Sequence, residues 1–177
     1  MNSFYRRVPR SIAYGKLLGV VSFRDATLAD ALPLHDLHRA AIDRRLRSHY
    51  GDGPIDRWLA RCDANPTRFE APLTTGIARV AEADGVLVGL CLYEPMPRTL
   101  SLWYVHPEFA GQGIGGRLLR EVEDTVRRLT PGAVWLHATR DSEPRFRRCG
   151  WHHLGWQACG RFAEIPAALM VKDLTVR

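Results

Sequence analysis

LSLWYVHPEFAGQGIGGRLLREVEDTVRRL, from Leu100 to Leu129, is the most informative stretch of the 177-residue chain. It opens with an apolar, aromatic-rich run from Leu100 to Val105, which predicts a strand with little solvent exposure. From Ile114 onward apolar residues recur every fourth position and charged residues fill the other face, which predicts an amphipathic helix. A glycine-rich turn separates the two elements, with Gly111, Gly113, Gly115 and Gly116.

This turn has the chemistry of an anion site. The start of a helix leaves about four backbone N–H groups without intrahelical partners and carries partial positive charge, so it can hold a phosphate. Glycine allows positive φ and lets the backbone approach the phosphate oxygens closely. The turn therefore favours a pyrophosphate ligand.

A dinucleotide fingerprint is one interpretation, because Gly111-x-Gly113-x-x-Gly116 has its spacing. Such a fingerprint should open a βαβ unit, with an acid about 20 residues further on at the end of the next strand. Asp141 does follow the next expected strand, Val134 to Thr139. However, the unit comes late in the chain, after a hairpin, and too little sequence follows for a dinucleotide domain. We do not expect NAD.

The stretch instead resembles the signature of the GCN5-related N-acetyltransferase (GNAT) superfamily, R/Q-x-x-G-x-G/A between a strand and a helix. The matching residues run from Ala110 to Gly115, and Ala110 stands where the family has Arg or Gln. The resemblance implies acetyl-CoA as co-substrate. Backbone amides of the turn would hold its pyrophosphate, and the strand near Tyr104 and Val105 would pair with the pantetheine arm. The implied turn residues are Gly111, Gln112, Gly113, Ile114, Gly115 and Gly116.

Composition bounds the class of protein. Hydrophobic residues at 46% and charged residues at 25% are ordinary globular values, and the net charge of +6 favours anionic partners. The cysteines lie far apart with no C-x-x-C pair, so we expect neither a metal site nor disulfides. We expect the thiols to be reduced, as in a cytoplasm. No apolar run is long enough to span a membrane. Residues 1–19 should form a loose, flexible extension, and residues 20–177 a single N-acetyltransferase domain.

Strand and helix patterns predict the order β-α-α-β-β-β-α-β-α-β-β from Val20 to Leu174. The Asp84-Gly85 pair signals a hairpin, and Asn65 to Thr75 reads as a loop. His35 and His38, one turn apart, are interpreted as a solvated helix face rather than a metal pair. We expect an α+β fold, a mostly antiparallel twisted sheet with helices on both faces, which is also the order of the GNAT family.

Arg145 to Trp151, RFRRCGW, is similar to a second GNAT element, usually written F-Y-x-x-x-G-F. The tyrosine of that element is the usual acid that reprotonates the coenzyme A thiolate, and Phe146 stands at its position. Either another group or water protonates the thiolate, or the domain binds acyl-CoA without efficient turnover. Phe146 could also pack beside the pantetheine.

The reaction also needs a base, because amines are mostly protonated at neutral pH. The glutamate that the family often places on the central strand is replaced by Thr99. Candidates are Glu94, His137 and Tyr104, with Tyr93 beside them, and each has a structural interpretation as a solvated acid or a packed side chain. His106, before Pro107, is expected to shape the turn.

The acceptor follows less directly. Small amines and protein amines are the leading partners, the basic balance also allows an aminoacyl-tRNA, and a homodimer is compatible with the sequence. Nucleic-acid binding as the main function is disfavoured, since no run of five basic residues occurs. Two classes remain beside the enzyme: a non-catalytic acyl-CoA-binding or regulatory domain, and a basic nucleic-acid-binding module. Scattered arginines, expected to meet an acceptor's carboxylate or phosphate or to face solvent, are Arg44, Arg45, Arg47, Arg57 and Arg61.

Overall fold

The computed structural model describes residues 20–162 and 165–175. Residues 1–19, expected to be a flexible extension, lie outside this range. The helices are α1 (Ala31–Tyr50), α2 (Asp52–Asp63), α3 (Glu70–Thr75), α4 (Ile114–Leu129) and α5 (Glu143–Arg148). The strands are β1 (Ser22–Asp25), β2 (Ile77–Ala83), β3 (Val86–Glu94), β4 (Thr99–Val105), β5 (Ala133–Ala138), β6 (His152–Cys159) and β7 (Ile165–Asp173). Short 3-10 turns include η3 (Pro107–Phe109) and η4 (Gly160–Phe162).

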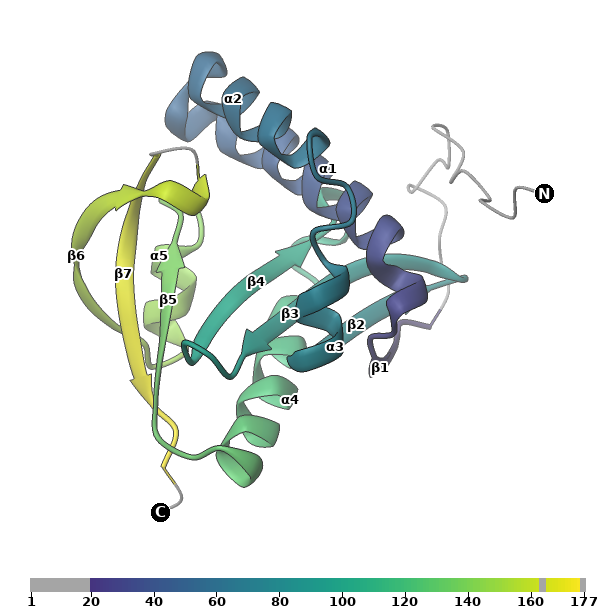
Figure 1. The fold of residues 1–177 in the computed structure, drawn as a ribbon, viewed down its shortest axis with the longest axis vertical. Coiled ribbons are helices and arrows are strands. Elements are labelled where there is room, and N and C mark those ends of the chain that lie inside the picture. The colour runs from purple at the N-terminus through teal and green to yellow at the C-terminus, as the bar shows by residue number, and fades with distance from the viewer. Residues whose placement is uncertain (1–19, 163–164, 176–177) are drawn as a thin grey trace.

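The strands form one seven-stranded sheet in the order β1-β2-β3-β4-β5-β7-β6 (Figure 1). Neighbouring strands run antiparallel except β4 and β5, which are parallel. Helices α1 and α2 lie on one side of this sheet, and α4 lies on the other. The expected α+β fold, a mostly antiparallel sheet with helices on both faces, is confirmed.

The helix α4 follows its sequence pattern closely. Leu118 and Val122 are fully buried against the sheet, while Arg117 and Arg120 face solvent. The opposite face of the sheet is covered by α1 and α2. Ile42 of α1 and Trp58 of α2 belong to one buried cluster. Leu34 of α1 belongs to another, together with the strand residues Val80 and Leu90. Two cores thus sandwich the sheet, as periodic apolar faces on both helices require.

The central strands β4 and β5 separate soon after they begin. Their pairing consists of Thr99 opposite Trp135, beyond which the strands diverge (Figure 1). A β-bulge lies beside this point, because Tyr93 pairs with Leu100 and Leu92 with Leu102, so Ser101 has no opposite residue on β3. A bulge bends its strand and ends regular pairing. The edge of β4 that faces β5 is therefore open past Thr99.

Two expectations are corrected by the structure. The segment expected to be a loop from Asn65 to Thr75 contains the short helix α3, which adds one helix to the predicted order. His35 and His38 do not form a solvated face: they are 8% and 1% exposed, because α2 and the segment after it pack across this side of α1.

Candidate functional site

The glycine turn holds its shape through two left-handed residues. Gly111 has φ +82° and Gly113 has φ +80°, a conformation that other L-residues rarely adopt. Gly113 is the N-cap of α4, and its carbonyl accepts the first intrahelical bond from the amide of Arg117. The amides of Gly113, Ile114, Gly115 and Gly116 therefore precede the first helical hydrogen bond and are the ones a helix start leaves without intrahelical partners.

Trp103 joins β4 to this turn. Its indole Nε1 donates a hydrogen bond to the carbonyl oxygen of Gly115 at 2.8 Å. A Cβ on Gly115 would lie 3.2 Å from Cζ2 of Trp103 and 3.3 Å from Cγ2 of Val105, so glycine allows this close approach. The first turn of α4 is thus packed directly on the open strand.

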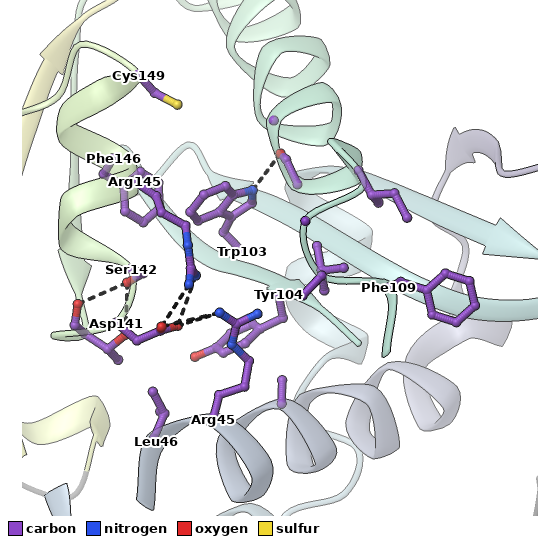
Figure 2. A pocket seen from close by; sticks show the side chains of 18 of the residues that line it. Arg45, Leu46, Trp103, Tyr104, Phe109, Asp141, Ser142, Arg145, Phe146 and Cys149 are labelled. Carbon is purple, nitrogen blue, oxygen red and sulfur yellow. Dashed lines mark hydrogen bonds and ion pairs between the residues drawn. The ribbon is translucent and has the colours of Figure 1, made fainter. Parts of the chain in front are cut away.

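A cavity of about 490 Å³ opens between the glycine turn, β4, β5, α5 and the last turns of α1 (Figure 2). We call it the glycine-turn cavity. Its lining includes Arg45, Ser101, Trp103, Tyr104, Val105, Ala110, Gly111, Gly113, Ile114, Gly115, Gly116, His137, Asp141, Arg145, Phe146, Arg148, Cys149 and Phe162.

The residues that the GNAT resemblance assigns to coenzyme A line this one cavity, with the exception of Gln112. The strand residues Tyr104 and Val105, the turn glycines and Phe146 all line it. Gln112 is exposed and does not belong to the lining, so the structure places its side chain outside the cavity. Ala110 lines the cavity without a side-chain donor, which leaves the backbone to supply the turn's hydrogen bonds.

A charged bridge crosses between α1 and α5 beside the cavity. The Asp141 carboxylate accepts from Arg145 at 2.9 Å and pairs with Arg45 at 3.1 Å, as the dashed lines in Figure 2 show. Burial alone would raise the pKa of Asp141, but its hydrogen bonds and ion pairs with the two arginines outweigh burial, and the pKa lies below its usual value. The carboxylate thus stays ionised at neutral pH and holds two cations at the wall of the cavity.

Phe146 is packed inside aromatic neighbours. It is 4% exposed, and its ring lies 4.4 Å from that of Trp103 and 5.7 Å from that of Trp151, centre to centre. Its side chain has no donor or acceptor, and it fills the wall of the cavity near Trp103 (Figure 2). The position therefore contributes packing.

The candidate catalytic residues are divided between two places. His137 and Tyr104 line the glycine-turn cavity, where His137 Nε2 is 2.8 Å from Nε2 of Gln157. Glu94 does not line it and belongs to a second, neighbouring pocket. Tyr93 is fully buried in the core. His106, 2% exposed, accepts from the amide of Glu108 and so caps the turn η3, the shaping role expected for it.

The second pocket has a volume of about 190 Å³ and lies on the α1, α2 and α3 side of the sheet. We call it the Arg68 pocket. It is lined by His38, Trp58, Arg68, Phe69, Pro72, Leu92, Glu94, Ser101, Leu102 and Phe162. Ser101 and Phe162 also line the glycine-turn cavity, so the two spaces meet at these side chains.

His38 and Arg68 are residues of this pocket that the sequence did not single out as functional. Nη2 of Arg68 donates to Nδ1 of His38 at 2.6 Å. Burial, together with the charge of Arg68 and the proximity of His35, holds the pKa of His38 well below its usual value, so the imidazole is neutral. No local sequence pattern marks this pair, because Arg68 stands in what reads as a loop and His38 on what reads as a polar helix face.

The arginines that were considered as acceptor contacts mostly bind the protein itself. Arg44 pairs with Glu108, Arg47 with Asp43, and Arg61 donates to the carbonyl of Gly160. Arg45 is the member of the set that lines the glycine-turn cavity.

Residues 20–162 and 165–175 contain neither a membrane-spanning helix nor a metal-binding cluster. No helix within residues 20–162 and 165–175 combines the length and apolar character needed to cross a bilayer. Within the same residues, no three His, Cys, Asp or Glu side chains gather where they could hold a metal ion.

Comparison with known proteins places this architecture. The model of the acetyltransferase (GNAT) family matches residues 34–151. A GCN5-related N-acetyltransferase from Rhodopseudomonas palustris superposes with a TM-score of 0.78 at 20% identity, covering 86% of this chain and 94% of its own. The PaiA N-acetyltransferase from Thermoplasma acidophilum, solved with coenzyme A, superposes with a TM-score of 0.70 at 18% identity, covering 87% and 99%. A phosphinothricin acetyltransferase from Sinorhizobium meliloti, solved with acetyl-CoA, gives 0.63 at 20% identity, covering 88% and 89%.

Comparison with curated protein sequences gave no match. The structural likenesses, all at 20% identity or below, bear on the fold, while the family model spans the strand, glycine turn and helix that form the cavity as well as most of the sheet. The chain belongs to the GNAT family of acetyltransferases.

Proposed function

We propose that the chain is an acetyl-CoA-dependent N-acetyltransferase that moves an acetyl group to a primary amine by direct attack in a ternary complex. The observation that carries this proposal is the glycine turn at the start of α4, which opens on a 490 Å³ cavity beside the unpaired edge of β4. A pyrophosphate and an extended arm are the two parts of acetyl-CoA that such a site would take.

Each part of the co-substrate has a counterpart in the cavity. The amides of Gly113 to Gly116 would donate to the pyrophosphate, with the helix start adding partial positive charge. The open backbone of β4 near Tyr104 and Val105 would pair with the amides of the pantetheine arm. Arg145 and Arg148, which line the same cavity, would add attraction for the phosphates.

Transfer would occur where β4 and β5 separate. A neutral amine attacks the thioester carbonyl, and a backbone N–H on the open edge of β4 would stabilise the oxyanion. Glu94, which lines the Arg68 pocket, is the base we favour, acting directly or through water, with His137 and Tyr104 as the alternatives.

The leaving thiolate needs little assistance. The reference pKa of a thiol is about 8.5, so a thiolate is a far better leaving group than an alkoxide and can take its proton from water. Phe146 cannot donate a proton, and its role is to pack against Trp103 at the cavity wall.

Calorimetric titration with acetyl-CoA, coenzyme A and NAD tests the cofactor assignment. We expect acetyl-CoA to bind in the micromolar range, about −8 kcal/mol, and NAD not to bind. Gly113→Asp should abolish acetyl-CoA binding, because it places a carboxylate at the proposed pyrophosphate. Gly85→Asp is the matched control, since Gly85 has φ +76° in the β2–β3 hairpin with no atom near its missing Cβ. Equal affinity in the two variants would overturn the site.

A non-catalytic acyl-CoA-binding or regulatory domain is the second candidate, and the observation that favours it is the buried, donor-free Phe146. Thiol release with a panel of amines separates the two. If acetyl-CoA binds but no amine of the panel causes release of free coenzyme A, the regulatory role is supported.

A further inference from the structure

The Arg68 side chain is a cation held in an aromatic pocket by neutral groups. Its Nη1 donates to Sγ of Cys62 at 3.1 Å, its Nη2 donates to the neutral His38, and its guanidinium lies 4.9 Å from the ring centre of Phe69. No carboxylate among the described residues forms an ion pair with it. Arg24, by contrast, is paired with both Asp30 and Glu82.

Half-burial makes this arrangement costly without a ligand. A charged group taken out of water needs a partner of opposite charge or several hydrogen bonds to offset its lost hydration. Cys62 and His38 supply weak or neutral acceptors on one side of the guanidinium. A carboxylate is the group that complements the planar fork of an arginine with two parallel hydrogen bonds.

The remaining walls of the pocket indicate the size and polarity of the molecule that would carry this carboxylate. Apart from Arg68, His38, Ser101 and Glu94, its walls are apolar or aromatic, with Trp58 stacked on Phe162 at 4.6 Å. Its volume of 190 Å³ is below the 300–1,000 Å³ of pockets for drug-sized ligands. A small apolar or aromatic group fits these walls, and a polymer or an oligosaccharide does not.

The position of the pocket connects it to the transfer step. Ser101 and Phe162 line both the Arg68 pocket and the glycine-turn cavity, so a ligand in the first can present a group to the second. Glu94 supplies a negative charge in the same pocket that holds the positive Arg68. A small pocket with one anionic and one cationic side chain matches a zwitterion, whose ammonium would face Glu94 and whose carboxylate would face Arg68.

We propose that the acceptor is a small amino acid with an apolar or aromatic side chain, whose carboxylate is bound by Arg68. This inference rests on the proposed acetyltransferase function. The amine nitrogen forms a bond to the acetyl carbon, the carbon–sulfur bond of the thioester breaks, the amine proton passes to the base, and the thiolate is protonated from water. The products are an N-acetylamino acid and free coenzyme A.

Matched acceptor pairs that differ in the carboxylate alone test the proposal. L-phenylalanine is compared with phenethylamine, and L-leucine with 3-methylbutylamine, by thiol release at saturating acetyl-CoA. We expect the amino acid of each pair to have the higher kcat/KM, by roughly 10- to 100-fold, since a charge-assisted pair would be lost with the carboxylate. 3-Phenylpropanoate, which has no amine, should inhibit competitively against L-phenylalanine.

Substitution at Arg68 removes the same interaction from the protein side. Arg68→Met should lower kcat/KM for L-phenylalanine by roughly 10- to 100-fold and leave phenethylamine within about threefold of wild type. Arg68→Lys keeps the positive charge but not the planar fork of hydrogen-bond donors. Its kcat/KM for L-phenylalanine should lie between those of wild type and Arg68→Met, and it replaces Arg68→Met as the test if that variant unfolds. Arg57→Met is the control, because Arg57 is exposed on α2 and does not line the pocket.

The outcomes separate this inference from the function on which it rests. If acetyl-CoA binds and the carboxylate-free amines are acetylated as well as the amino acids, the carboxylate assignment is overturned and the acetyltransferase stands. Acetyl-CoA binding with equal losses for both acceptors in Arg68→Met also overturns it. If acetyl-CoA does not bind at all, the proposed function fails first.

Discussion

The indole Nε1 of Trp103 lies 2.8 Å from the carbonyl oxygen of Gly115, and this hydrogen bond ties the open strand β4 to the first turn of α4. The strand and the turn are the two surfaces proposed to hold acetyl-CoA, so the bond fixes their spacing. Trp103→Phe keeps an aromatic ring but removes the donor. We expect it to lower the free energy of unfolding by about 1 kcal/mol and to weaken acetyl-CoA binding by about fivefold.

Trp156→Phe is the control for this change, because Trp156 is 48% exposed on β6 and does not line the cavity. Urea unfolding and calorimetric titration measure the two effects. Unchanged acetyl-CoA affinity in Trp103→Phe, with the stability loss present, would show that the hydrogen bond stabilises the fold without positioning the turn.

Asp141 should make the stability of the protein depend on pH. Its pKa is held below the usual value because the hydrogen bonds and charges of Arg145 and Arg45 outweigh its burial. A carboxyl with a depressed folded-state pKa stabilises the protein above its unfolded-state pKa of about 4, and this contribution is lost as the pH falls through the folded-state value. Asp141→Asn should therefore cost about 1 kcal/mol at pH 7, since Arg145 is partly exposed and solvent screens the pair.

Urea unfolding of wild type and Asp141→Asn at pH 7 and at pH 3 measures this difference, and urea is used because it leaves ion pairs unscreened. We expect the gap between the two proteins to narrow at the lower pH. Asp124→Asn is the control, since Asp124 is 68% exposed and pairs with Arg127 three residues away. A gap that is constant with pH would mean that Asp141 acts by packing rather than by charge.

Glu94 is expected to be the base for the acceptor amine. It lines the Arg68 pocket on the acceptor side, whereas His137 and Tyr104 line the glycine-turn cavity. Glu94→Gln should lower kcat by about 10²- to 10⁴-fold, the usual contribution of a positioned base, and leave the affinity for acetyl-CoA unchanged. Thiol release across a range of pH measures the loss, which should shrink as the free amine becomes abundant at high pH.

The same assay applied to His137→Asn and Tyr104→Phe compares the alternatives. Glu108→Gln is the matched control, because Glu108 pairs with Arg44 outside both cavities. A larger loss in either alternative variant would move the assignment to that residue, and losses under about tenfold in all three would indicate that water alone takes the proton.

Much of the fold could be predicted from local sequence periods. The four-residue repeat of α4 and the Asp84-Gly85 hairpin signal correctly gave the elements, because burial of one face forces such patterns. The bulge at Ser101 and the separation of β4 from β5 could not be predicted this way. They arise from pairing between strands distant in the chain, and neither strand carries a local signal for where its partner ends.

The candidate site was likewise predictable where it depends on local sequence and unpredictable where it depends on contacts between distant residues. The glycine turn was predictable because its left-handed positions require particular residues in consecutive order. Arg68 and His38 were not, because they are brought together from an irregular segment and the buried side of α1, thirty residues apart in the chain. Polar side chains on a helix read as solvated until the structure shows what packs over them.

Phe146 offers the last test, since the resemblance to the GNAT element implies a tyrosine acid at this position. Phe146→Tyr adds a hydroxyl within the aromatic packing of Trp103 and Trp151, where overfilling a packed site costs about 1–3 kcal/mol of stability. Because a thiolate with a pKa of about 8.5 leaves without an acid, we expect kcat to change by less than about tenfold. Thiol release and thermal unfolding measure both effects, with Phe146→Leu as the control for altered packing. A rise in kcat above about 10²-fold would show that protonation of the thiolate limits turnover of the wild-type protein.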